Sequence, residues 1–130
     1  MNSEAAMVAC IKLAALSQDR QQWLPRDKFL ILAGVAAVEA GSRPVAEQCR
    51  TLVLSHNPQH LIGSHSSFAA ALENPDFQAF AKQLSRFCSY EQAEHLLTQN
   101  NLSAGRPAEG ISWDDYALLL LHRMDLRQPT

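Results

Sequence analysis

The chain has 130 residues and a mass of 14.4 kDa, the size of one ordinary domain without room for a second substantial core. Hydrophobic residues make up 47% of it, which is enough to build a core and excludes a disordered chain. The formal net charge of -2 argues against a protein that binds nucleic acid or an anionic membrane. We expect one domain over residues 1–130, with residues 126–130 frayed.

Residue usage predicts the fold class. The chain contains 19 Ala and 18 Leu but only 5 Val, 4 Ile and 3 Thr. Ala and Leu suit helices, whereas the β-branched residues suit strands. The sequence therefore predicts an all-α domain, an irregular bundle of six to seven short helices around a central apolar helix at about residues 27–40.

Cysteine usage and the N-terminus indicate the compartment. Three cysteines, an odd number, do not suggest a disulfide framework, and the first residues lack the positive segment of a secretory signal. The longest apolar run, residues 29–38, is about half of what a membrane span needs. We expect a cytoplasmic protein with no membrane segment and no cofactor.

The first half of the chain predicts three helices. Ser3 is the expected cap of a helix that runs to about Ser17. The central helix follows Pro25 and is apolar on nearly all sides, so we expect other helices around it. Gly41 is placed to end that helix in a left-handed conformation, and Ser42 is placed to cap the next one.

The second half predicts three or four helices with clear start signals. A short helix is expected at about residues 66–73. Asn74 and Pro75 then open a strongly amphipathic helix, and Ser89 begins the next one with the spacing of a capping box. Residues 101–111 form the only long predicted loop, after which Ser112 caps the last helix.

The cysteines at positions 10, 49 and 88 are 39 residues apart, a period that would suit a helical-hairpin repeat. The surrounding residues match in the first two units but not in the third, where Pro107 intervenes. We interpret the spacing as a coincidence and leave the repeat as the alternative.

A His-rich turn at residues 56–65 is the first candidate site. His56, His60 and His65 follow Cys49, and imidazole and thiolate are good zinc ligands. Asn57 and Pro58 interrupt the helix between the first two histidines, and no known zinc-finger spacing is present. We expect no metal, and keep a metal or small-ligand site on these four residues as an alternative hypothesis.

Catalytic motifs are not visible in the sequence. The one thiol–imidazole candidate, Cys88 with His95, is separated by the predicted helix start at Ser89. No nucleophile elbow, phosphate-binding loop or dinucleotide fingerprint occurs. We therefore predict a protein that is not an enzyme.

The turn at residues 37–46 permits a helix-turn-helix hypothesis. A DNA-reading second helix needs several basic or amide side chains. Here Arg43, Gln48 and Arg50 are offset by Glu47 in an acidic chain, so nucleic-acid binding is kept only as a minor alternative.

The favoured hypothesis is an interaction surface. Trp23 lies in a polar linker, and Leu118, Leu119 and Leu121 widen the apolar face of the last helix. Exposed apolar patches of this kind mark partner sites, although the same residues can also close over the core of a small domain. We expect a protein–protein interaction or self-association module, with a homodimer as one possibility.

Overall fold

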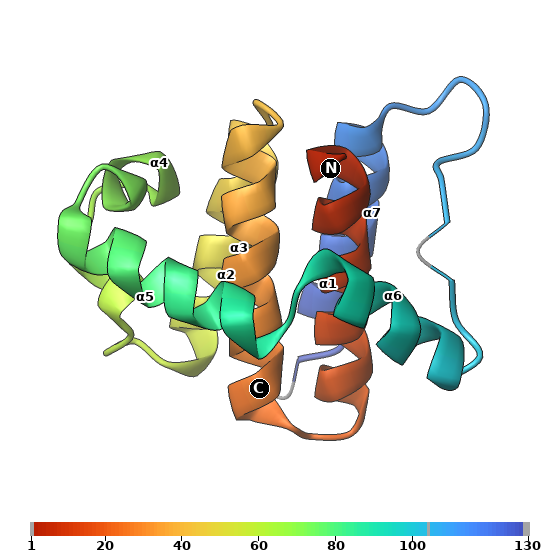
Figure 1. Cartoon of the computed structure of the whole chain (residues 1–130), viewed down its shortest axis with the longest axis horizontal. Coiled ribbons are helices and arrows are strands. Elements are labelled where there is room, and N and C mark those ends of the chain that lie inside the picture. The colour runs from red at the N-terminus through yellow and green to blue at the C-terminus, as the bar shows by residue number, and fades with distance from the viewer. Residues whose placement is uncertain (1, 104, 129–130) are drawn as a thin grey trace.

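The helix-forming composition is realised along nearly the whole chain. The computed structural model describes residues 2–103 and 105–128, and these contain helices and no strand. Figure 1 shows their arrangement. The elements are α1 (Ser3–Asp19), α2 (Trp23–Glu39), α3 (Arg43–His56), the 3₁₀ helix η1 (Leu61–Ser64), α4 (Phe68–Leu72), α5 (Pro75–Phe87), α6 (Tyr90–Gln99) and α7 (Trp113–Leu126). The all-α prediction is confirmed. Across the described residues, every helix is too short or too polar to cross a bilayer.

Three of the predicted helix starts are confirmed by their caps. The side chain of Asn74 accepts from the backbone of α5, and Ser112 accepts from that of α7. Ser89 and Gln92 form a complete capping box at α6. These signals are local, because a cap side chain bonds to an amide two or three residues away, and so they are readable from sequence.

Two predicted caps are corrected. Helix α1 is capped by Asn2, whose Oδ1 accepts from two backbone amides, and Ser3 is already helical. Ser42 makes no cap bond at α3, because its hydroxyl donates to Asp114 at the start of α7 instead. That contact joins two helices that are far apart in sequence, which no local pattern indicates.

The core is built on two central helices instead of the one expected. Helices α1 and α2 pack against each other along their length, and both are buried on most sides. Helix α2 also begins four residues earlier than predicted, at Trp23, because Pro25 fits a first turn that needs no amide hydrogen bonds. Gly41 ends α2 with a φ of 80°, as predicted.

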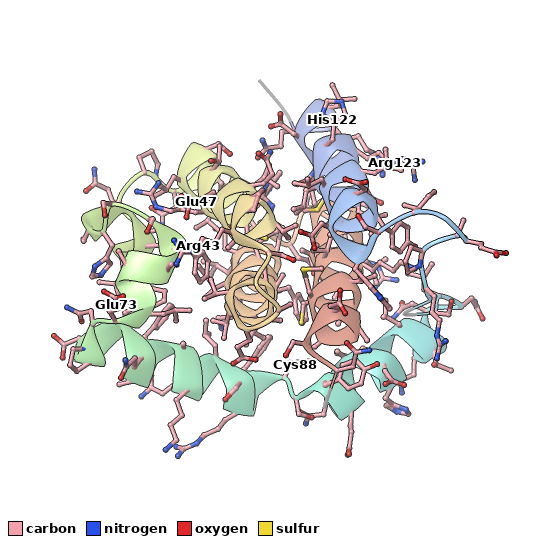
Figure 2. All side chains as sticks on the ribbon, turned by 90° about the horizontal axis from the view of Figure 1, so that it is seen from above. Arg43, Glu47, Glu73, Cys88, His122 and Arg123 are labelled. Atoms are coloured by element: carbon pink, nitrogen blue, oxygen red, sulfur yellow. The ribbon has the colours of Figure 1, made fainter. Side chains whose placement is uncertain are left out.

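The remaining helices form a layer on each side of this pair. Helices α3 and α7 pack on one side, while α5 covers α2 and α6 covers α1 on the other. Figure 2 shows the three layers from above, with α5 and α6 nearly in line. Helix α4 lies at the end of the bundle beside α3, where the ring of Phe68 packs directly on the backbone of α2 at Gly34.

The C-terminal segment differs from the expected frayed end. Leu126 is the last residue of α7, and Gln128 is held by hydrogen bonds from Arg26 and Ser55. Residues 129 and 130, which the same prediction covered, lie outside the described residues. The chain is therefore anchored at least as far as Gln128.

Candidate functional site

The four candidate metal ligands lie in separate environments. Cys49 is fully buried in the core, where desolvation raises the pKa of its thiol. Nδ1 of His60 accepts from the backbone amide of Ile62 at 3.0 Å, and His65 packs edge-on against Phe77. Burial lowers the pKa of His60, against a smaller opposing effect of Asp27. His60 and His65 therefore make contacts that hold the turn in place.

His56 belongs to a different constellation, with its Nδ1 at 2.7 Å from Asp27 Oδ2. Within residues 2–103 and 105–128, no group of three or more His, Cys, Asp or Glu side chains is placed to hold a metal ion. The structure therefore does not bring together Cys49, His56, His60 and His65, the four residues of the alternative metal site.

The residues of the predicted interaction surface do not form one patch. Leu121 is fully buried, so its interpretation as a surface residue is wrong. Leu118 is partly buried against the core, and only Leu119 is exposed, at 44%. Trp23 stacks on His56 with ring centroids 5.1 Å apart, and so covers the polar network described next.

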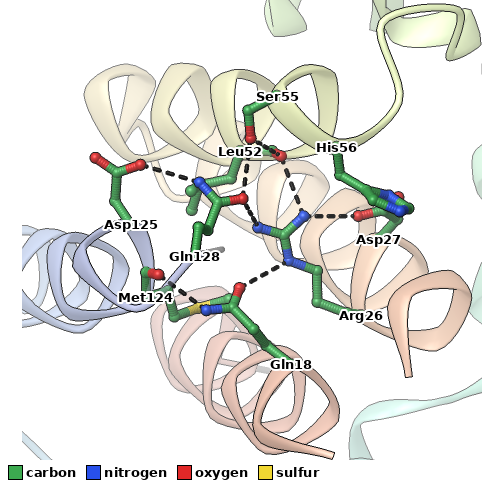
Figure 3. A network of polar contacts seen from close by, with 9 residues as sticks. All are labelled: Gln18, Arg26, Asp27, Leu52, Ser55, His56, Met124, Asp125 and Gln128. Carbon is green, nitrogen blue, oxygen red and sulfur yellow. Dashed lines mark hydrogen bonds and ion pairs between the residues drawn. The ribbon is translucent and has the colours of Figure 1, made fainter. Parts of the chain in front are cut away.

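Arg26 forms the centre of a buried polar network between α1, α2, α3 and the C-terminal segment (Figure 3). Its guanidinium is fully buried and donates to Asp27 at 2.9 Å, to Gln18 at 3.1 Å and to the carbonyl oxygen of Leu52 at 3.1 Å. Gln128 accepts its fourth bond, at 2.7 Å. Burial lowers the pKa of Arg26, and the bond to Asp27 opposes this.

Each nitrogen of the Arg26 guanidinium donates within the fold. Gln18 also donates to the carbonyl oxygen of Met124 at the end of α7, and the indole of Trp23 lies under the guanidinium of Arg26. A buried charge is tolerated when it is paired and its donors are satisfied. The network thus ties four segments of the chain together around a fully buried guanidinium.

A cleft of about 920 Å³ lies on the opposite side of the molecule, between the central pair and the junction of α5 with α6. Its floor comes from α1 and α2 and its outer wall from the junction. The lining residues are Ser3, Ala6, Cys10, Leu32, Val35, Ala36, Glu39, Ser85, Cys88, Ser89, Tyr90, Glu91 and Glu94. None of these thirteen is Lys or Arg.

Local geometry explains why the cleft exists. Helix α5 ends at Phe87, and the chain passes through Cys88 and Ser89 in extended conformations before α6 begins. Figure 2 shows Cys88 at this break. The floor below consists largely of small side chains, including Ala6, Cys10 and Ala36. Short side chains beneath an interrupted helix leave space that larger ones would fill.

The rim of the cleft is acidic. Glu39 comes from α2, while Glu91 and Glu94 come from α6. The Ser3 hydroxyl donates to Glu39 at 3.4 Å. A hydrogen bond to Glu94 raises the pKa of Tyr90, with desolvation adding to the effect. The carboxylates therefore gather around an apolar floor, with hydroxyl groups between them.

The thiols in the cleft are not activated. Desolvation raises the pKa of Cys10 to about 12, with a smaller contribution from Cys88, and burial also raises the pKa of Cys88. A nucleophilic cysteine needs a depressed pKa so that its thiolate is present at neutral pH. The two thiols act here as small apolar groups that border the space.

A second hollow of about 380 Å³ adjoins the cleft on the outer side of the junction. It shares Cys88 and Glu91 with the cleft and adds Phe87, Gln92, His95 and Leu96. The sequence pair Cys88 and His95 thus borders one hollow, although the thiol remains protonated. Residues of α6 thus line both the cleft and this second hollow.

Arg50, one of the basic residues of the helix-turn-helix hypothesis, makes contacts within the protein. Helices α2 and α3 do form consecutive helices joined at Gly41. The guanidinium of Arg50 donates to the carbonyl oxygen of His65 at 2.7 Å and lies 3.8 Å from Glu47. This side chain holds the His-rich turn against α3, so it is occupied within the protein.

Comparison with protein-family models, with curated proteins and with solved structures finds no match to this chain.

The cleft was missed by the sequence interpretation, which concentrated on histidines and surplus leucines. The signal at Ser89 correctly placed the interruption between α5 and α6. Nothing local indicates that this interruption crosses over Ala6, Cys10 and Ala36, because that depends on which helix faces pack together.

Proposed function

We propose that this protein is a binding module without catalytic activity, and that its site is the cleft between α1, α2 and the α5–α6 junction. The observation that carries the proposal is the composition of the lining, an apolar floor with a few polar groups at the rim. This combination is typical of ligand sites, in which apolar contacts supply affinity and a few polar groups orient the ligand.

The rest of the molecule supports a binding role in this cleft over the other features considered. The Arg26 network is satisfied internally, and Leu121 is part of the core. The cleft has a volume of about 920 Å³ and is partly open to solvent. We propose a protein segment as its occupant, in keeping with the interaction module expected from the sequence.

The test is to fill the cleft. Val35 is partly buried and lines it, so Val35→Trp places an indole in the space. Val38→Trp is the matched control, since Val38 lies on the same helix, is also partly buried, and borders a different hollow. Both variants are compared with the native protein by circular dichroism, to establish that each is folded.

Binding is measured with a neutral solvatochromic dye, which reports an apolar site without a contribution from net charge. We expect dye fluorescence to increase with the native protein and with Val38→Trp, and to be lost with Val35→Trp. Equal dye binding by all three proteins would refute the cleft as the site. Light scattering on the same samples identifies a second copy as the occupant if a native dimer becomes a monomer in Val35→Trp.

A further inference from the structure

We propose that the partner in this cleft is an amphipathic helix whose apolar stripe is bordered by Lys or Arg side chains. The inference rests on the proposed function and specifies the chemistry of the segment that binds. It is drawn from the charge of the rim, the character of the walls and the shape of the two adjoining hollows.

The charge of the rim selects a basic partner. Glu39, Glu91 and Glu94 stand around the apolar floor, and no lining residue is Lys or Arg. Complementary charge speeds the encounter of two partners and excludes partners of like charge. An acidic segment or an anionic lipid headgroup would meet three carboxylates, whereas Lys and Arg side chains on the two flanks of a helix would meet them as counterions.

The walls of the cleft favour a helix over an extended peptide. An extended peptide needs backbone partners, which a sheet edge supplies, and the described residues contain no strand. The walls formed by α1, α2 and α6 use their own backbone groups in helical hydrogen bonds. A proline-rich segment needs a groove with several aromatic rings, and this lining contains only Tyr90. A helix satisfies its own backbone and needs only an apolar surface.

The shape of the site suits an elongated ligand. The cleft of about 920 Å³ and the hollow of about 380 Å³ share Cys88 and Glu91 in their linings and so lie next to each other. In that hollow Phe87 is 45% exposed, with Lys28 Nζ 4.8 Å from its ring centroid. Apolar side chains on successive helical turns can enter the two spaces from one stripe.

The experiment uses two model helical peptides that share leucines at one apolar stripe and differ only on its flanks. One carries Lys at the flanking positions and the other carries Glu. Binding of each labelled peptide to the native protein is followed by fluorescence anisotropy. We expect the Lys peptide to bind about tenfold more tightly or better, with the ratio falling as salt is raised from about 0.1 to 0.5 M.

The variant Glu39→Gln/Glu91→Gln/Glu94→Gln removes the three rim charges. We expect it to reduce the preference for the Lys peptide to within about threefold. The matched control, Glu73→Gln/Glu109→Gln/Asp115→Asn, removes three charges outside the cleft, including one in the first turn of a helix as Glu91 is. The control should keep the native preference, since the rim is intact.

The outcomes separate this inference from the proposed function. If the two peptides bind equally, or if neither binds while the neutral dye still distinguishes Val35→Trp from Val38→Trp, the helix inference is wrong and the cleft remains a site. If the control variant loses the preference as fully as the rim variant, net charge is responsible and the rim is not. If the dye fails to distinguish the two tryptophan variants, the proposed function itself is wrong.

Discussion

Nδ1 of His56 lies 2.7 Å from Oδ2 of Asp27, while Oδ1 of the same carboxylate accepts from Arg26 at 2.9 Å. One carboxylate from α2 thus links a fully buried guanidinium to a half-buried imidazole on α3. The indole of Trp23 stacks on the imidazole and covers the group. Asp27 is the only acidic side chain that an ion pair joins to Arg26 within the described residues.

Removing this carboxylate should destabilise the protein strongly. In Asp27→Ala the charge of Arg26 stays buried without its counterion, a change that costs about 3–5 kcal/mol in comparable sites. Urea unfolding measures the loss. Asp19→Ala is the control, because its pair with Arg127 at 3.4 Å is exposed on both sides and should contribute less than about 1 kcal/mol. Similar losses in the two variants would contradict a special role for Asp27.

The hydrogen bond that Gln128 accepts from Arg26 should also contribute to the stability of the protein. Gln128→Ala leaves one donor of Arg26 without its acceptor, while the Ser55 hydroxyl keeps the carbonyl oxygen of Leu52 as a partner. We expect the change to cost about 1–3 kcal/mol in the free energy of unfolding. Gln128→Glu keeps an acceptor oxygen for Arg26 but loses the bond that Nε2 donates to Asp125 at 3.1 Å and brings two carboxylates together, so it should recover only part of the native stability. A neutral effect of Gln128→Ala would show that this segment is not anchored in solution.

Gly34 should not tolerate alanine. In most helix interiors glycine-to-alanine replacement stabilises by about 1 kcal/mol. Here the added Cβ would overlap the ring of Phe68, so the sign reverses and we expect a loss of about 1–3 kcal/mol. The double variant Gly34→Ala/Phe68→Leu provides the control, since a smaller side chain at position 68 makes room. The double variant should lose less free energy of unfolding than the two single variants lose in sum.

The buried thiol of Cys10 predicts sensitivity to alkali. Its pKa is about 12 in the folded protein and 9.0 without burial, so the native state keeps a proton that the unfolded state releases. The stability that this provides is fully present below pH 9.0 and is lost as the pH rises toward about 12. Each pH unit in that interval removes up to about 1.4 kcal/mol.

Cys10→Ala should reduce this dependence by the contribution of one thiol, because alanine does not titrate, while the raised pKa values of Cys49 and Cys88 keep the remainder. The measurement is urea unfolding at a series of pH values between neutrality and pH 11 or so, with the slopes compared. Val8→Ala is the control, a core truncation on the same helix without a titratable group. It should lower the stability while keeping the native slope. An unchanged slope in Cys10→Ala would exclude the thiol as the source.

The sequence predicts features that depend on near neighbours. The caps at Asn74, Ser89 and Ser112 and the stop at Gly41 are correct, because each is decided by backbone and side-chain geometry within a few residues. The all-α class follows from the same local preferences. The burial of helix α1 on most sides, by contrast, depends on which helices pack around it, and its own residues do not indicate this.

The candidate site depends on contacts between segments that are distant in the sequence. It could therefore not be predicted from the sequence. The sequence around Leu121 does not distinguish a buried leucine from an exposed one, because its burial depends on the position of α1. The three rim residues belong to α2 and α6, which are far apart along the chain. The space between them arises where the break between α5 and α6 crosses the central pair of helices. No pattern of hydrophobic residues encodes such a crossing.

The bond between Arg26 and Gln128 spans 102 positions of the chain. During synthesis the first three helices leave the ribosome well before Gln128 does, and any early compact state of these helices holds a guanidinium that lacks one of its acceptors. The other three acceptors of Arg26, on Gln18, Asp27 and Leu52, all belong to these first helices. A chain that stopped before Gln128 would therefore keep most of the partners of Arg26 and leave one donor of a buried charge without an acceptor.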